Sequence, residues 1–223
     1  MSNLFDIACN FSSERFDNDL EDVLARAKEN NVNKFLVVSA SLEDVKKVYS
    51  IYKNNIDECF FTIGTHPHHA NTFNNSSIKL MIELINDYQP HSVGETGLDF
   101  FRNISSYEEQ IFAFEEQIKI SINTNKPLFL HQRDAHEDFI KIIRSYKNDI
   151  KRAVVHCFTG TQKELDDYLE MGFYIGLTGW ICDERRNVDL RKSIKNIPLD
   201  KDNQFLSLAF LKVYFENLLK IYL

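Results

Sequence analysis

The stretch Ser92-Val93-Gly94-Glu95-Thr96-Gly97-Leu98-Asp99 places an acidic residue at the end of a short apolar segment, with glycines on either side of it. We interpret it as a strand whose end carries a metal ligand, Glu95. Two later apolar segments end at a different donor, one at His131 and the other at His156. Each is separated from the one before by about the length of a strand-loop-helix-loop unit. Three successive parallel strands would therefore deliver Glu95, His131 and His156 to the same side of a sheet.

The rest of the chain alternates between strand-like and helix-like segments. Besides the three strands above, we expect strands at residues 4–9, 35–39, 59–64 and 173–177. Capping boxes predict two of the helix starts, one formed by Ser105 with Glu108 and the other by Thr161 with Glu164. Seven strands that alternate with helices favour parallel connections, and hence an α/β fold that closes as a TIM-like (β/α) barrel.

The end of the chain departs from this alternation. Residues 204–223 are rich in apolar side chains at helix-like spacing, and no strand that ends in an acidic residue is evident there. We therefore predict that seven β/α units form the barrel and that its eighth strand is missing or atypical. Residues 1–201 are expected to be the barrel, and residues 202–223 an apolar helical tail that is not a separate domain.

Composition narrows the functional classes. Among 223 residues, 43% are hydrophobic, yet no stretch approaches the length of a membrane span. The four cysteines include no C-x-x-C pair, which is typical of free thiols in a reducing compartment. We predict a cytoplasmic or nuclear protein without a membrane partner. A net charge of −7 argues against a protein that coats duplex nucleic acid, although bound divalent cations can supply positive charge locally.

The three strand-end residues carry the chemistry. A single histidine at a strand end is more often structural, but a glutamate with two histidines at unit spacing indicates a metal site. Their mixed oxygen and nitrogen donors suit Zn, Mn or Mg, and the Glu95 carboxylate could bridge two ions. Such ions generate hydroxide from water near neutral pH and stabilise the charge of a reacting phosphoryl group.

Three neighbouring segments leave alternatives open. The histidines that begin with His66 suggest a second metal site, hydrogen bonding to a substrate phosphate, or a merely exposed cluster. Arg133 is placed either to bind phosphate in bidentate fashion or to pair with a neighbouring carboxylate. The segment after Trp180 suits either a lid that stacks bases and binds phosphate or an ordinary solvated loop. No residue is assigned as the catalytic base.

Several longer motifs resemble one family. In order along the chain they are Gly64-Thr65-His66-Pro67-His68, Gly94-Glu95-Thr96-Gly97-Leu98-Asp99, His131-Gln132-Arg133-Asp134-Ala135-His136, His156-Cys157-Phe158-Thr159-Gly160-Thr161 and Thr178-Gly179-Trp180-Ile181-Cys182-Asp183-Glu184-Arg185-Arg186. Over residues 5–201 the chain resembles the TatD-type metal-dependent deoxyribonucleases, a branch of the amidohydrolase-like barrels. The resemblance implies hydrolysis of DNA from the 3′ end with two divalent cations. Within it, Glu95, His131 and His156 match the metal ligands, and His66 matches a histidine that faces substrate.

The chain also departs from the family pattern. Cys9 and Asn10 stand where many relatives carry His-x-His, and Gln132 stands where cysteine is common. Nothing matches the family's metal-binding aspartate after the last strand, because Asp200 and Asp202 precede the expected strand.

Three hypotheses follow. The first is a divalent-metal-dependent deoxyribonuclease, a 3′–5′ exonuclease whose substrate is single-stranded or end-frayed DNA. The second is a metal-dependent hydrolase of a small cyclic amide or ester, which is disfavoured because the first strand lacks His-x-His and Lys126 precedes its strand. The third is a catalytically impaired, truncated form that binds metal or a partner.

Overall fold

The computed structural model describes residues 4–183, 188–197 and 206–209. These residues form one curved parallel sheet in the order β1 to β8, so that neighbours in sequence are neighbours in the sheet. Its strands are β1 (Leu4–Cys9), β2 (Val32–Val37), β3 (Cys59–Ile63), β4 (Ser92–Asp99), β5 (Leu128–Arg133), β6 (Ala153–Val155), β7 (Tyr174–Thr178) and β8 (Leu206–Ala209). All seven predicted strands are therefore confirmed.

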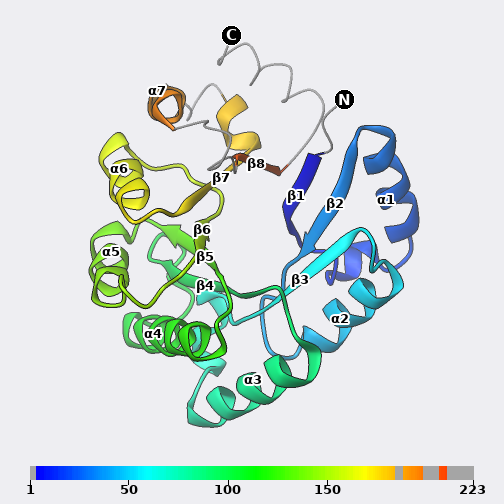
Figure 1. Cartoon of the computed structure of the whole chain (residues 1–223), viewed down its shortest axis with the longest axis horizontal. Helices are drawn as coiled ribbons and strands as arrows, with labels where there is room; N and C mark the ends of the chain where they lie inside the picture. Colours follow the sequence, from blue (N-terminus) through cyan, green and yellow to red (C-terminus); the bar gives the residue numbers. More distant parts are fainter. Residues whose placement is uncertain (1–3, 184–187, 198–205, 210–223) are drawn as a thin grey trace.

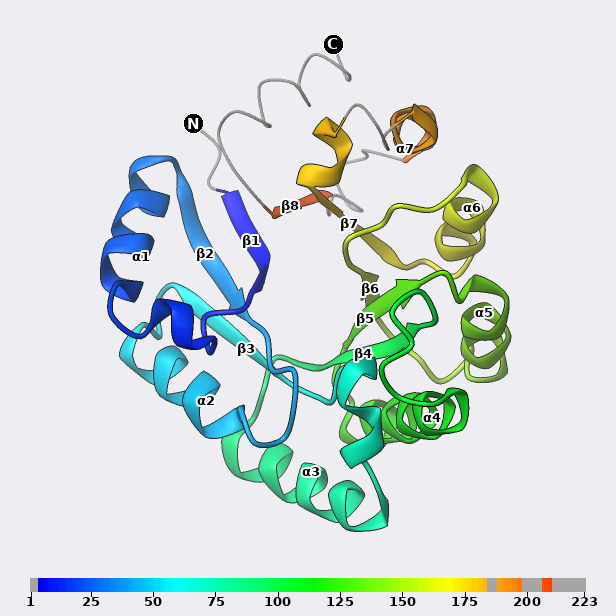
Figure 2. The same cartoon turned by 180° about the vertical axis from the view of Figure 1, so that it is seen from behind.

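Helices join the strands and form an outer layer around them (Figures 1 and 2). The α-helices are α1 (Leu20–Glu29), α2 (Val45–Asn54), α3 (Asn75–Tyr88), α4 (Tyr107–Thr124), α5 (His136–Ser145), α6 (Gln162–Glu170) and α7 (Val188–Ser193), and the short 3₁₀ helices are η1 (Glu14–Phe16), η2 (Pro67–Thr72), η3 (Gly179–Cys182) and η4 (Ile194–Asn196). This arrangement of parallel strands inside helices is the predicted barrel architecture. None of the described helices is long and apolar enough to cross a bilayer.

Capping explains where two helices begin. The Thr161–Glu164 box at the start of α6 is confirmed. At α4 the prediction was one residue early, because Ser106 and Glu109 form the box. Ser105 is engaged elsewhere, since its hydroxyl accepts a hydrogen bond from the Asn71 amide.

The core has two parts. The larger hydrophobic cluster fills the space between the sheet and its helices, with Phe61, Phe114 and Phe139 among its fully buried side chains. A smaller cluster is formed by Leu36 of β2, the following Val38 and Phe129 of β5. Burial of apolar surface on both faces explains why these strands are nearly continuous apolar runs in the sequence.

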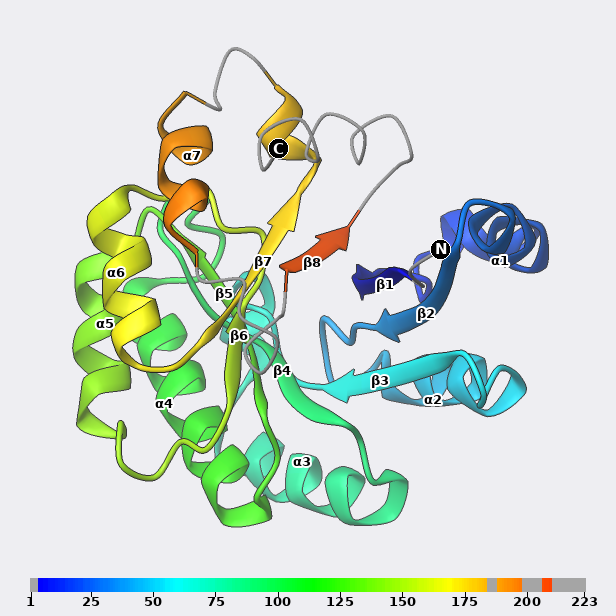
Figure 3. The same cartoon turned by 45° about the horizontal axis from the view of Figure 1, so that its top comes forward.

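The eighth strand is present but short. Residues Leu206–Ala209 pair in parallel with β7, as Figure 3 shows, and also contact β1. Among the described strands the hydrogen-bonded ladder runs from β1 to β8, and β8 does not pair with β1. The prediction that residues 202–223 are helical is therefore wrong for these four residues. The other residues of that tail, together with Asp200 and Asp202, lie outside the described residues, and the single-domain organisation stays a prediction.

Candidate metal and phosphodiester site

A cavity of about 490 Å³ opens at the carboxyl ends of the strands. Parallel barrels place their sites at this end because the strand-to-helix loops converge there. The cavity is lined by Ala8, Asn10, Val38, Ala40, His66, His68, His69, Glu95, Arg102, His131, Gln132, Arg133, His156, Cys157 and Trp180. All five predicted site residues are thus brought together in one cavity.

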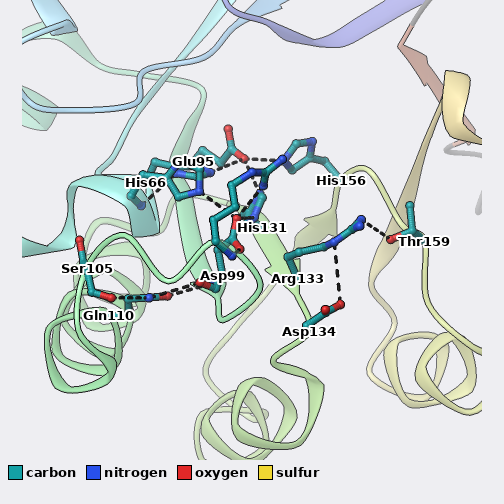
Figure 4. Close-up of polar contacts among 12 residues, drawn as sticks. His66, Glu95, Asp99, Ser105, Gln110, His131, Arg133, Asp134, His156 and Thr159 are labelled. Carbon is teal, nitrogen blue, oxygen red and sulfur yellow. Dashed lines mark hydrogen bonds and ion pairs between the residues drawn. The ribbon is translucent and has the colours of Figure 1, made fainter.

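The Glu95 carboxylate is the centre of the cavity. Its Oε1 atom lies 3.0 Å from His131 Nδ1 and 2.5 Å from His156 Nε2 (Figure 4). His66 Nε2 approaches the same oxygen to 3.4 Å. The three predicted ligands therefore converge on one point, and His66, predicted to face substrate, joins them there.

The donor set fits a divalent cation. Ligand atoms of His66, Glu95 and His131 all lie within 4.8 Å of one another, which is the one such group found among the described residues. His156 shares Oε1 of Glu95 with them. A carboxylate with imidazoles offers borderline ligands that suit Zn and Mn.

The charges in this cluster depend on one another. Burial alone would raise the pKa of the Glu95 carboxyl, but the imidazoles of His156, His66 and His131 hold it well below its usual range. Burial also opposes a charged His131, yet hydrogen bonds to Asp99 and Glu95 raise its pKa to about 9. For His66 burial prevails and lowers the pKa, despite the nearby Glu95. The site therefore favours an ionised Glu95, which is the state that binds a cation.

Asp99 is a site residue that the sequence reasoning did not identify. Its side chain is 1% exposed, and its Oδ2 atom lies 2.7 Å from Arg102 Nη1, 2.9 Å from His68 Nε2 and 3.2 Å from His131 Nε2. Burial opposes ionisation of this carboxyl, but these hydrogen bonds hold its pKa well below the usual range. Its sequence signal is its place at the end of β4, four residues after Glu95 on the same strand.

Two buried glutamines on α4 fix the loops that carry these groups. Gln117 accepts a hydrogen bond from the Thr65 amide at 2.7 Å and donates to the Thr65 carbonyl at 3.0 Å, directly before His66. Gln110 accepts from the Asp99 amide at 2.8 Å and donates to the Ser105 carbonyl at 2.9 Å. Each amide satisfies backbone groups that would otherwise be buried without partners.

Arg133, at the end of β5, also lines the cavity. Its Nη1 atom donates to Thr159 Oγ1 at 3.2 Å, and its Nε lies 3.8 Å from Asp134. Its guanidinium carbon is 5.1 Å from the centre of the Phe101 ring and 5.7 Å from that of Trp180. The ion pair with Asp134 is long and Asp134 is exposed, so most of the fixed contacts of Arg133 come from Thr159 and the two rings.

His136 does not line the cavity and instead connects two helices. Its Nε2 and Nδ1 atoms lie 2.9 Å from Asp167 and 3.1 Å from the Tyr168 hydroxyl, respectively. Arg144 donates to the other Asp167 oxygen at 2.5 Å. These contacts join α5 to α6.

Comparisons with known proteins agree with this geometry. A family model described as "TatD related DNase" matches residues 5–201. The 3′-5′ ssDNA/RNA exonuclease TatD of Erwinia tasmaniensis is 40% identical over 198 residues, which cover 89% of this chain and 76% of that protein. The corresponding protein of Cronobacter sakazakii is 39% identical, with 89% and 75% covered.

Solved structures show the same fold. A TatD homologue from Escherichia coli K12 superposes with a TM-score of 0.82 at 26% identity, covering 92% of this chain and 76% of that one. A TatD-family hydrolase from Entamoeba histolytica gives a TM-score of 0.77 at 26% identity, with 94% and 74% covered. The chain therefore belongs to the TatD-related DNase family, which confirms the resemblance of its motifs.

Proposed function

We propose that this protein is a divalent-metal-dependent 3′–5′ exonuclease that hydrolyses phosphodiester bonds of single-stranded DNA and RNA. The nuclease class follows from family membership, and the polarity and substrates from relatives that are about 40% identical and carry that description. The observation that carries the proposal is the convergence of His66, His131 and His156 on one oxygen of Glu95 at the open end of the barrel.

In this proposal Glu95, His131 and His156 hold the metal, and His66 faces the substrate beside them. The family resemblance favours two divalent cations of Mg, Mn or Zn. The described residues supply one compact donor group, and Asn10 occupies the cavity wall at the end of β1. When bound, divalent cations lower the pKa of water and neutralise phosphoryl charge.

The charge pattern of the cavity suits a polyanion. Glu95 is the one carboxylate among the residues that line it, whereas Arg102 and Arg133 both reach its wall. A guanidinium presents several N–H groups that match phosphate oxygens. Because Arg102 is paired with Asp99, Arg133 is the proposed phosphate-binding residue.

The shortening of a labelled oligonucleotide tests the proposed nuclease function directly. A 5′-labelled single strand of DNA, and its RNA counterpart, are incubated with Mn²⁺ or Mg²⁺, and products that shorten stepwise from the 3′ end are expected. Glu95→Gln keeps the side-chain shape but removes the anionic ligand, so a loss of at least about a hundredfold is expected. Glu170→Gln, which changes an exposed glutamate at the end of α6, is the matched control.

The outcomes separate the three hypotheses. Equal rates for the wild type and Glu95→Gln would contradict the nuclease proposal. Hydrolysis of a cyclic amide or ester without strand shortening would favour the small-substrate alternative. Metal binding without either reaction would favour the impaired form. A cytoplasmic or nuclear location stays a prediction.

A further inference from the structure

The loop after β4 holds an aromatic ring in an unusual place. Phe101 is 61% exposed and lies next to the cavity, since it directly precedes Arg102 and its ring contacts Arg133, and both arginines line the cavity. A single exposed apolar side chain is ordinary on a protein surface and by itself needs no ligand. Its surroundings distinguish Phe101 from such a residue.

The backbone on both sides of Phe101 is anchored. The Phe100 amide donates to the Arg133 carbonyl at 3.0 Å, and the Arg102 amide donates to Asp99 Oδ1 at 2.9 Å. The Asn103 amide also returns to the Asp99 carbonyl at 3.2 Å. Residues that are fixed to β4 and β5 thus present the ring, so little conformational entropy is lost when a ligand stacks on it.

The ring is also adjacent to the cationic wall of the cavity. The guanidinium carbon of Arg133 lies 5.1 Å from its centre, within cation–π range. Arg133 contacts Trp180 at 5.7 Å as well, so it links Phe101 to the part-buried Trp180 across the rim. An exposed aromatic surface next to groups that bind phosphate is the combination that single-stranded nucleic acids require.

We propose that the exposed ring of Phe101 is a stacking site for an unpaired nucleobase that flanks the scissile phosphodiester, while Arg133 contacts the backbone phosphate. The inference rests on the proposed nuclease function and gives it a physical basis for strand preference. A base in a duplex is already stacked and paired, so placing it on Phe101 requires fraying first. An apolar protein partner fits this surface less well, because Arg102 and Arg133 border it.

Kinetics with a matched variant test the site. Phe101→Ala is expected to raise KM for a single-stranded oligonucleotide about tenfold, the size expected for loss of one base–aromatic contact, with kcat changed less than about twofold. Phe101→Trp should keep the wild-type KM. Ile104→Ala is the control, because Ile104 belongs to the same loop and is also 61% exposed but has no aromatic ring on which a base could stack.

Abasic substrates identify the contact. Replacing the base on one side of the scissile phosphate with an abasic residue should raise the wild-type KM by a similar factor, and Phe101→Ala should then add nothing. The stacking site is overturned if Phe101→Ala leaves KM unchanged, or if its effect persists with an abasic residue on either side.

Oligonucleotide binding tests the stacking site independently of the proposed nuclease function. Fluorescence anisotropy with the same oligonucleotides is measured in the Glu95→Gln background, where no turnover is needed. A wild type that never shortens a strand would contradict the nuclease function alone. Equal affinities of Glu95→Gln and the Glu95→Gln, Phe101→Ala double variant would contradict the stacking site alone.

Discussion

Asp99 shows how one residue organises the site without being part of the convergent cluster. His131 points Nδ1 at Glu95 and Nε2 at Asp99, so the second contact orients the ring for the first. Carboxylates that accept the distal N–H of a ligating imidazole raise the basicity of that ligand. Arg102 and His68 in turn hold Asp99 in place.

Asp99→Asn should weaken metal binding while leaving the fold intact. An amide cannot accept from three donors with the strength of a carboxylate, so the affinity for Mn²⁺ should fall about 10- to 100-fold. Isothermal titration measures it. Asp149→Asn, an exposed aspartate in the loop between α5 and β6 at the other end of the barrel, should bind Mn²⁺ like the wild type. Unchanged affinity of Asp99→Asn would refute a positioning role.

Among the elements, β4 is the one that most depends on glycine. Gly94 and Gly97 have φ values of 140° and 146°, a region that other residues rarely adopt. A Cβ at Gly97 would overlap the carbonyl oxygen of His131, and a Cβ at Gly94 would overlap that of Phe129. Close approach of β4 to β5 is what brings Glu95 within reach of His131.

Gly97→Ala should therefore destabilise the protein by about 3 kcal/mol or more, through both backbone strain and the clash with β5. Gly172→Ala is the matched control, because Gly172 also has a positive φ of 70° but nothing lies within 4 Å of the added methyl. It should cost about 1 kcal/mol. Urea unfolding measures both, and equal losses would mean that the clash is relieved by movement of the strands.

The contact between α5 and α6 predicts a pH dependence of stability. Hydrogen bonding to His136, supported by Arg144, lowers the pKa of the Asp167 carboxyl. A lowered pKa contributes stability that is present above about pH 4, the ordinary range of aspartate, and is lost as the pH falls through the folded-state pKa. Asp167→Asn should cost about 1 kcal/mol at pH 7, and the difference from the wild type should shrink below about pH 4 in urea titrations. A difference in unfolding free energy between the wild type and Asp167→Asn that stays constant from pH 7 to pH 3 would contradict this assignment.

For the whole molecule, metal binding and folding are linked, because the three proposed ligands come from three separate segments, namely β4, β5 and the loop after β6. At a free Mn²⁺ concentration one hundred times Kd, binding should add about 2.7 kcal/mol, which raises Tm by about 5–10 °C. Differential scanning calorimetry should show this shift in the wild type, its removal by EDTA, and little shift in Glu95→Gln. A shift of equal size in Glu95→Gln would place the metal elsewhere.

Features that depend on local sequence patterns could be predicted, whereas features that depend on contacts between separate segments could not. Strand order, the barrel and the convergence of Glu95, His131 and His156 could be predicted because each depends on local apolar periodicity and repeated unit spacing. Asp99 and Phe101 were not identified, because no local sequence pattern shows whether an acidic residue at a strand end, or an aromatic residue in the next loop, lies in the site or in solvent. Gln110 and Gln117 were not identified either, since their partners are backbone groups outside their own helix, at Asp99 and Ser105 for Gln110 and at Thr65 for Gln117.

The sequence by itself determined which strands carry Glu95 and His131, because side-chain hydrophobicity and chain spacing are properties of the segment alone. It did not determine where those strands end, since β4 continues to Asp99 and β5 to Arg133. Only the tertiary structure decided that His66 joins Glu95 and that Asp99 supports His131. It also decided that residues Leu206–Ala209 add a strand beside β7, although their apolar sequence resembles a helix. These outcomes depend on which backbone and side-chain groups are in contact across the barrel. The packing of the whole sheet determines these contacts.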